Sequence, residues 1–306
     1  MNQKKKIQMA IIGLGAIAEK AYLPIVCNHP KIDPILCSRN PETLKRLALQ
    51  YRIKETYTNI EELIKNKPDA AMVHSATQSH FSIIKKLLTA GIPVFVDKPL
   101  SYTLNEVEEL LELSAKNHLL LYVGFNRRFA PLISQLTSHI PNQVLWQKNR
   151  VNLPGDPRIF VFDDFIHVID GLRFLAGGSA SNLSVFPKME KGKLQALNVT
   201  WKYKDTWVYG GMNRISGITE ERIEYYAEGY KWQIDELVSG TQYQNEKQLP
   251  ITFDNWESTL YKRGFVAMID DWINTLSPRK FDKKRNDDIW QTHLLCEQIV
   301  AEIVIG

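Results

Sequence analysis

The stretch from Ile7 to Ala18 constrains the fold of this chain more than any other. An apolar run through Ile12 ends directly in the pattern Gly13-x-Gly15-x-x-Ala18. An apolar run that glycine ends is typical of a buried parallel strand. In that setting Gly13 would allow a tight turn, Gly15 would let the backbone approach a pyrophosphate, and Ala18 would let the next helix lie close to the strand. Since a helix N-terminus offers N–H groups to phosphates, the stretch predicts a dinucleotide site rather than a plain strand–turn–helix.

Length and charge set the broad class of protein. The 306 residues are enough for two domains, and 44% hydrophobic with 24% charged residues is typical of soluble globular proteins. The net charge of +4 includes the run from Lys4 to Lys6, which is interpreted as a solvated tail. Because no basic stripe with interleaved aromatic residues follows, we expect no nucleic-acid partner.

The cysteines and the apolar segments bear on the compartment. Cys27, Cys37 and Cys296 are few, odd in number and without metal-type spacing, which favours a reducing cytoplasm. No stretch is long and apolar enough to span a membrane, and the run after the lysines is broken by Gln8, unlike a signal peptide. We therefore expect a cytoplasmic protein with no membrane partner and no metal site.

Strands and helices alternate through the first 123 residues. The predicted strands after the first cover residues 32–37, 70–74, 92–96 and 119–123. Helix caps fit this division, because Asn59 and Ser79 precede helical stretches and Gly91 follows one. The alternation predicts a parallel sheet with right-handed crossovers, and hence an α/β fold with a Rossmann dinucleotide-binding domain over residues 1–123.

The pattern changes after residue 123. All seven tryptophans lie beyond it. Apolar and polar residues alternate over 197–204, 222–228 and 230–234, which is typical of antiparallel strands with one covered and one open face. Closing helices are expected over 258–276 and 287–303. Residues 124–306 are therefore predicted to form an α+β substrate-binding and oligomerisation domain with a large, mainly antiparallel open sheet.

Lys98 is the first candidate catalytic residue. It follows the predicted strand 92–96 and precedes Pro99, which fixes the backbone after it. Ligands of open parallel sheets bind beyond the carboxyl ends of the strands, where a lysine can donate a hydrogen bond to a carbonyl or alkoxide oxygen. The alternative is an ordinary solvated lysine, but the position at the cofactor edge favours function.

The second candidate site surrounds His167. Asp163, His167 and Asp170 fall at i, i+4 and i+7, on a different helical face from the apolar residues around them. Carboxylates one turn either side could orient the imidazole and raise its pKa. A solvated stripe with an exposed histidine explains the same spacing, so the pattern alone leaves both interpretations open.

Together these motifs resemble one family. Gly13-x-Gly15-x-x-Ala18, the run Val96-Asp97-Lys98-Pro99, then Asn126-Arg127-Arg128 and Asp163-x-x-x-His167 are similar, in order and spacing, to the glucose–fructose oxidoreductase / inositol dehydrogenase / MocA family. Within that family the chain looks most like the MviM-type oxidoreductases. The resemblance covers the whole chain and implies nicotinamide-dependent hydride transfer to or from a sugar-like or cyclic polyol carbon.

The resemblance also implies roles for single residues. Lys98 matches the catalytic lysine of the family, His167 its acid/base histidine and Asp163 the carboxylate that positions substrate. The stretch from Ser75 through Thr77 to His80 matches a motif that lines the cofactor. Two departures stand out: Asp97 replaces the usual glutamate before Lys-Pro, and Ala76 replaces a proline, which would loosen that loop.

The predicted cofactor is NADP, with NAD as the alternative. NAD-preferring sites place an acid at the end of the second strand, but here that strand ends in Ser38-Arg39, which can bind a 2′-phosphate. Arg39 pointing to solvent is the other interpretation. The predicted cofactor-binding residues are Gly13, Gly15, Ala16, Ile17, Ser38, Arg39, Ser75, Thr77, His80, Asp97, Lys98, Asn126 and Arg127.

Several alternatives stay open at this point. The chain could be a dinucleotide-binding sensor without turnover, or a reductase of a non-sugar carbonyl or imine. Four basic residues either line the cleft, which would favour an anionic substrate, or lie on the surface; they are Arg127, Lys148, Arg150 and Arg158. Residues 152–157 are expected to form a loop over the site. The open face of the aromatic-rich sheet is expected to be covered, and the resemblance implies that a second subunit covers it, in a homodimer or homotetramer.

Overall fold

The computed structural model describes residues 6–276 and 281–305, which form two compact units. The first unit holds the chain up to Gly124 together with Met268–Trp290. The second holds Phe125–Ala267 and the chain from Gln291 onward. The chain thus leaves the first unit after Gly124 and returns to it over Met268–Trp290. The functional division into 1–123 and 124–306 stays a prediction.

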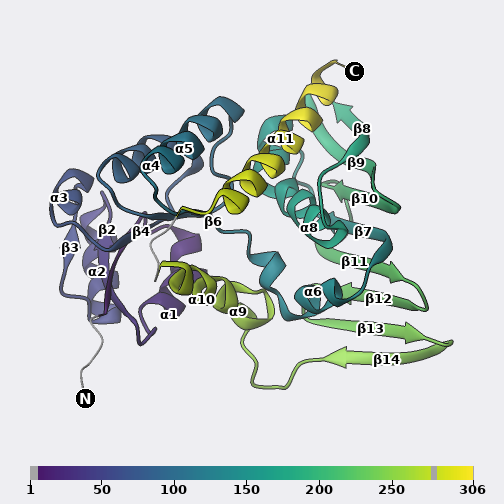
Figure 1. Ribbon diagram of the computed structural model, residues 1–306, viewed down its shortest axis with the longest axis horizontal. Coiled ribbons are helices and arrows are strands. Elements are labelled where there is room, and N and C mark those ends of the chain that lie inside the picture. Colours follow the sequence, from purple (N-terminus) through teal and green to yellow (C-terminus); the bar gives the residue numbers. More distant parts are fainter. Residues whose placement is uncertain (1–5, 277–280, 306) are drawn as a thin grey trace. The chain divides into compact units, whose positions relative to one another are not determined.

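The first unit is built on a six-stranded parallel sheet in the order β3-β2-β1-β4-β5-β6 (Figure 1). The strands are β1 Ile7–Ile12, β2 Ile32–Cys37, β3 Thr56–Tyr57, β4 Ala70–Val73, β5 Val94–Val96 and β6 Leu121–Val123. The helices between them are α1 Leu23–Val26, α2 Pro41–Tyr51, α3 Ile60–Lys65, α4 His80–Thr89 and α5 Leu104–Lys116. All of β4 is buried, as a strand covered on both faces must be. This is the predicted Rossmann sheet, whose strand order reverses between β1 and β4.

The helix caps of this unit agree with the sequence in one case and differ in another. Asn59 caps α3, because its side-chain oxygen accepts from the N–H of Glu61 at 2.7 Å. The prediction that Ser79 caps α4 is wrong. Thr77–Ser79 form a 3₁₀ turn, and Ser79 has helical dihedrals (φ −99°, ψ −6°) instead of the extended backbone of a cap. Its hydroxyl donates to Ser75 Oγ at 2.8 Å.

The second unit is built on an eight-stranded sheet in the order β14-β13-β12-β11-β7-β10-β9-β8 (Figure 1). The strands are β7 Pro141–Asn149, β8 Ser181–Glu190, β9 Lys193–Tyr203, β10 Thr206–Asn213, β11 Glu220–Ala227, β12 Tyr230–Asp235, β13 Ser239–Gln244 and β14 Lys247–Thr252. Neighbours are antiparallel except for the parallel pair β7 and β10. The large, mainly antiparallel sheet predicted from the alternating segments is confirmed.

One helix covers the inner face of this sheet. α8 (Ile166–Ala176) continues a π-helix, η5 (Val161–Phe165), and the short α7 (Pro157–Phe160). Gly171 lets α8 approach β7, because a Cβ there would lie 2.1 Å from the Trp146 ring. Val144, Trp146 and Lys148 of β7 are all buried on this inner side, with period two.

The remaining helices confirm the closing helix predicted over 287–303 but not the single helix predicted over 258–276. They are α6 Pro131–Ser134, α9 Thr259–Lys262, α10 Phe265–Leu276 and α11 Lys283–Ile305. The single helix predicted over 258–276 is interrupted at Gly264, which has a φ of +80°. A Cβ on Gly264 would lie 2.3 Å from the carbonyl oxygen of Asn126, so the break follows from a close backbone approach.

Membrane spans and metal clusters are both absent from residues 6–276 and 281–305. None of the helices there has the length and apolar character that a bilayer crossing requires. In the same residues no three histidine, cysteine, aspartate or glutamate side chains gather where they could hold a metal ion.

Candidate active site

The register of the parallel strands brings the predicted cofactor residues to one sheet edge. Ile12 lies opposite Cys37 and Val73, and Val73 lies opposite Val96. The residues that follow these four strand ends therefore stand at one level; they are Gly13, Ser38, His74 and Asp97. This edge is the carboxyl edge at the reversal of strand order, where ligands of such sheets bind.

The fingerprint residues have the geometry that a dinucleotide requires. Gly13 has a φ of +86°, and a Cβ there would lie 2.5 Å from the backbone nitrogen of Ser75. Gly15 faces open space, because a Cβ there would have no atom of the described residues within 4 Å, and helical structure begins at Ala16. Ala18 is fully buried against the sheet. The residues present thus fit a pyrophosphate between Gly15 and the first turn of the helix.

The turn after β2 carries the predicted 2′-phosphate site. Ser38 Oγ accepts from the Asn40 N–H at 3.2 Å, and Asn40 in turn caps α2. Arg39 is exposed at this turn, and none of the residues from Ser38 to Asn40 is acidic. The turn therefore offers a hydroxyl and a guanidinium at the edge of the sheet without a carboxylate to repel phosphate.

His80 joins two loops of the sheet edge. It is 1% exposed, its Nε2 lies 2.9 Å from the carbonyl oxygen of Ser75, and its Nδ1 lies 2.9 Å from that of Pro99. Burial lowers the pKa of His80, while these backbone contacts oppose the shift. His80 thus fixes the loop of Ser75 and Thr77 to the loop of Lys98. A contact of His80 with the cofactor itself stays a prediction.

Asp97 and Lys98 follow β5 in sequence but take different roles. Asp97 Oδ1 accepts from the Tyr22 hydroxyl at 3.0 Å and from the Lys98 N–H at 3.0 Å. The shorter carboxylate is thereby held inside the unit, where burial raises its pKa. Lys98 is half-buried, and its bond to Pro99 is cis. Ala76 has a φ of −63°, the value that a proline imposes, so its backbone conformation is the one the family's proline would give.

The acid/base half of the predicted site lies in the second unit. Asp163 belongs to η5 and His167 to α8, and both are half-buried. A π-helix within a longer helix is common at functional sites. The predicted catalytic residues belong to both units, with Lys98 in the first and Asp163 and His167 in the second.

The stripe of three residues predicted around His167 is not continuous. Asp170 is 1% exposed and its carboxylate is bound by Arg128, with Nε 2.8 Å from Oδ2. Thr292 also donates to Asp170, at 3.3 Å. The carboxylate one turn beyond His167 therefore neutralises Arg128. The spacing did not reveal this, because the partner lies 42 residues away.

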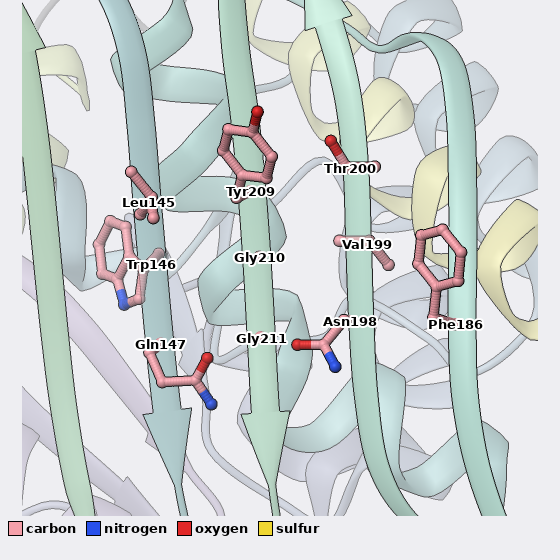
Figure 2. A pocket seen from close by; sticks show the side chains of 10 residues that line it. All are labelled: Leu145, Trp146, Gln147, Phe186, Asn198, Val199, Thr200, Tyr209, Gly210 and Gly211. Carbon is pink, nitrogen blue, oxygen red and sulfur yellow. The ribbon is translucent and has the colours of Figure 1, made fainter.

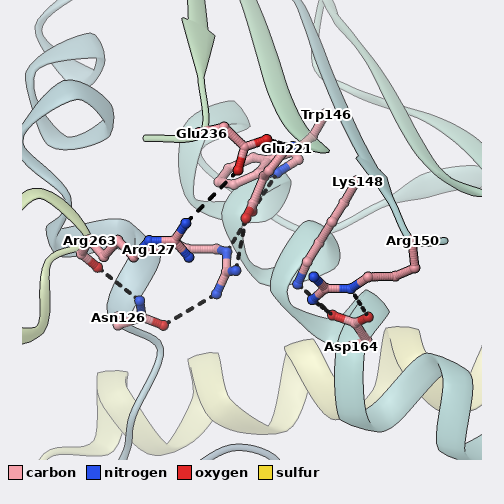
Figure 3. A network of polar contacts seen from close by, with 9 residues as sticks. All are labelled: Asn126, Arg127, Trp146, Lys148, Arg150, Asp164, Glu221, Glu236 and Arg263. Atoms are coloured by element: carbon pink, nitrogen blue, oxygen red, sulfur yellow. Dashed lines mark hydrogen bonds and ion pairs between the residues drawn. The ribbon is translucent and has the colours of Figure 1, made fainter. Parts of the chain in front are cut away.

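The basic residues expected at the cleft or surface are held in ion pairs. Arg127 binds Glu221 through Nε at 2.6 Å and Nη2 at 2.9 Å, in a buried pair (Figure 3). Arg158 binds Glu297 through two contacts of 2.7 Å. Asn126 donates to the backbone oxygen of Arg263 at 2.8 Å. These contacts give Arg127 and Asn126 roles inside the second unit, while their contact with cofactor stays a prediction.

Asp164 is a functional candidate that sequence reasoning missed. Its carboxylate binds Lys148, Arg150 and, from the end of β10, Arg214 (Figure 3 shows the first two). Lys148 is not a surface lysine, because its side chain is only 2% exposed; its place in a substrate cleft stays a prediction. The alternation of β7 places Lys148 on the same side as the buried Trp146, and this pattern could have predicted that Lys148 is buried.

Comparison with known proteins agrees with this geometry. Residues 7–125 match the model of the oxidoreductase family with an NAD-binding Rossmann fold, and residues 132–247 match that of the YceM-like C-terminal domain. YceM of Salmonella typhimurium is 30% identical over 275 residues, which cover 88% of this chain and 89% of YceM. The chain belongs to the Gfo/Idh/MocA oxidoreductase family. The predicted family is thereby confirmed.

Solved structures of Gfo/Idh/MocA proteins extend the likeness to the whole fold. A family member from Vibrio cholerae is 35% identical with a TM-score of 0.92, over 98% of this chain and 100% of that one. The MviM dehydrogenase from Clostridium difficile is 29% identical with a TM-score of 0.91, over 97% and 100%. The family match identifies the chain as a member of an oxidoreductase family with an NAD-binding Rossmann domain.

Proposed function

We propose that this protein transfers hydride between NADP and a carbon of a sugar-like or cyclic polyol substrate. The observation that carries the proposal is the sheet edge of the first unit, where the glycine turn, the Ser75 loop and Lys98 follow strands in matched register. A curated relative, the myo-inositol 2-dehydrogenase of Thermotoga maritima, supports the polyol class at 25% identity over 171 residues, 54% of this chain and 50% of that one.

Each catalytic residue has a proposed task. A bound nicotinamide would donate or accept the hydride. In the oxidising direction His167 takes the proton of the substrate hydroxyl, and Lys98 stabilises the developing alkoxide. Asp163, one helical turn before His167, orients the substrate or the imidazole. The roles reverse in reduction.

The experiment for this proposal is a substrate panel with purified protein. Oxidation of NADPH in the presence of keto-sugars or keto-polyols, but not of simple ketones or imines, is the expected result. Oxidation only with non-sugar carbonyls or imines would favour the second candidate reaction. Tight cofactor binding without any turnover would favour a sensor and contradict the proposal.

Arg39 is proposed to select NADP. A charge-assisted bond to the 2′-phosphate is worth about 1.5–3 kcal/mol, which corresponds to a preference of roughly ten- to a hundredfold. Arg39→Ala should weaken NADPH binding by that factor and leave NADH binding unchanged, measured by fluorescence titration. Lys45→Ala, an exposed lysine of α2, is the matched control and should change neither. Equal affinity for both cofactors in the unmodified protein would contradict the NADP preference.

The outer face of the eight-stranded sheet is proposed to bind a second copy of this chain. Phe186 and Trp207 are 59% and 49% exposed there. Beside them is a hollow of about 380 Å³ whose lining includes Gln147, Asn198 and Tyr209 (Figure 2). The edge strands β8 and β14 contain Pro187 and Pro250, which disfavour pairing through the edges. Association face to face, as a homodimer or homotetramer, is the arrangement these features favour.

Tyr209→Glu should separate the subunits, because it places a charge in the middle of that face. Light scattering should give a multiple of the single-chain mass for the unmodified protein and the single-chain mass for the variant. Ile140→Glu, at a residue that is also exposed but precedes the sheet, should stay associated. A single-chain mass for the unmodified protein would exclude the proposal. The cytoplasmic location inferred from the cysteines stays a prediction.

A further inference from the structure

Three cationic side chains meet at one carboxylate in the second unit. β7 and β10 run parallel, so their carboxyl ends emerge side by side, with Arg150 after one strand and Arg214 after the other. Lys148 Nζ lies 2.5 Å from Asp164 Oδ1, Arg150 Nε lies 2.9 Å from Oδ2, and Arg214 Nη2 lies 3.2 Å from Oδ2. Arg150 Nη2 adds a fourth contact, 3.0 Å from Oδ1.

These four contacts use the whole hydrogen-bonding capacity of Asp164. A carboxylate accepts about four hydrogen bonds, whereas a lysine and two arginines carry many more N–H groups. When Lys148 is protonated, three positive charges share the one negative charge of Asp164, and the adjacent pair of Arg127 and Glu221 is already neutral. The cluster therefore has more hydrogen-bond donors than Asp164 can accept from, and an excess of positive charge.

Two further acids attract the cluster electrostatically: the charge of Asp163 acts on Arg214, and that of Glu236 acts on Arg150. Glu236 Oε1 accepts from the backbone N–H of Glu221 at 2.6 Å. Arg214 Nε is buried and has no partner among the described residues, although an unpaired buried donor is destabilising.

Arg150 is the member of the cluster that is most accessible to solvent. Its side chain is 32% exposed, whereas those of Lys148 and Arg214 are 2% and 7% exposed. The backbone of Leu153, in the loop expected over the site, donates to the Arg214 carbonyl oxygen at 2.7 Å. Asp164 lies beside Asp163 and less than one helical turn before His167, at a rise of about 5 Å along the axis.

We propose that the cluster of Lys148, Arg150 and Arg214 binds an anionic group of the substrate, a carboxylate or phosphate, while the reacting carbon lies at Asp163 and His167. The inference rests on the proposed function and names its substrate class: acidic or phosphorylated sugars and polyols. An anion there would offset the excess positive charge and supply the acceptor that Arg214 Nε lacks.

Protonation of Lys148 should be linked to this binding. Burial lowers the pKa of Lys148 to about 7, with Arg127 and Arg150 adding to the shift and Glu221 and Asp164 opposing it. A bound anion favours the protonated form, so binding takes up a proton near neutral pH. Affinity for the anion should therefore be highest below about pH 7 and fall as the pH rises through that value.

The test is calorimetric titration of the full chain with inorganic phosphate and, separately, with acetate. Arg150→Gln should weaken binding of the favoured anion at least tenfold. Arg158→Gln, which also removes one charge and breaks a two-contact carboxylate pair at similar exposure, should change it less than twofold. Tighter binding of phosphate would indicate that the site takes a phosphate group, and tighter binding of acetate would indicate a carboxylate.

A kinetic comparison completes the test. The ratio of kcat/KM for an acidic substrate to that for its neutral counterpart should be high in the unmodified protein and fall at least tenfold in Arg150→Gln. No binding of either anion, or binding and ratios that Arg150→Gln leaves unchanged, would overturn the inference while the proposed function stands. Absence of turnover with every substrate would instead contradict the proposed function, and the titration would still decide the anion site.

Discussion

Replacing Lys98 with methionine is expected to lower turnover about a hundredfold and to leave cofactor affinity nearly unchanged. The loss is typical of removing one electrostatic or acid/base group from a reacting centre. Lys98 follows Asp97, which stands at the level of Gly13, so Lys98 lies at the carboxyl edge of the sheet but outside the glycine turn. Steady-state rates and a fluorescence titration of the reduced cofactor measure the two quantities separately.

Lys116→Met is the matched control. Lys116 is exposed in the last turn of α5, in the same unit, and its loss should change neither quantity. A Lys98→Met protein that kept the turnover of the unmodified protein would show that Lys98 is an ordinary surface lysine.

Replacing Glu221 with alanine is expected to destabilise the second unit by about 3–5 kcal/mol, because it leaves a buried guanidinium without its partner. Glu221 binds Arg127 through two contacts and accepts from Trp146 Nε1 at 3.1 Å. Glu224→Ala is the control on the same strand: Glu224 pairs with Lys231 on the opposite, open face. That partly exposed pair should contribute at most about 1 kcal/mol. Urea denaturation measures both.

The pH dependence gives a second measurement for Glu221. Burial would raise its pKa, but Arg127 and Lys148 hold it at about 2, below the ordinary 4.5. A depressed carboxyl pKa stabilises the folded state above the unfolded value, so this stability should be lost as the pH falls from 4.5 toward 2. The curve of Glu221→Ala should be flatter there. Equal destabilisation by Glu221→Ala and Glu224→Ala would contradict the buried pair.

Local patterns in the sequence were enough to predict most of the fold. The glycine turn, the buried strands and the cap at Asn59 each depend on residues within a few positions of one another. Two errors have different causes. Ser79 loses its cap role because its hydroxyl donates to that of Ser75, four residues earlier. Gly264 interrupts a helix because backbone far away in the sequence, at Asn126, lies against it.

The candidate site was predictable only in part, for the same reason. Lys98, Asp163 and His167 stand in local motifs, so the chain itself marks them. The partners of the basic residues do not lie in local motifs, because Arg127 and Glu221 are 94 residues apart and Arg214 and Asp164 are 50 apart. Such pairs arise only when β7, β10 and β11 align in the sheet. Sequence patterns therefore could not decide between cleft and surface for Arg127 and Lys148, whereas both are buried.

Isotope labelling shows whether this protein transfers hydride from the cofactor to a carbonyl carbon. NADPH with deuterium at the transferred position should be incubated with the protein and a panel of neutral and acidic keto-sugars. We expect deuterium on the former carbonyl carbon of an acidic or phosphorylated product, detected by mass spectrometry. We also expect a much slower transfer in Lys98→Met and His167→Ala. Unmodified protein that binds NADPH and yet transfers deuterium to none of the substrates would contradict the proposed hydride transfer.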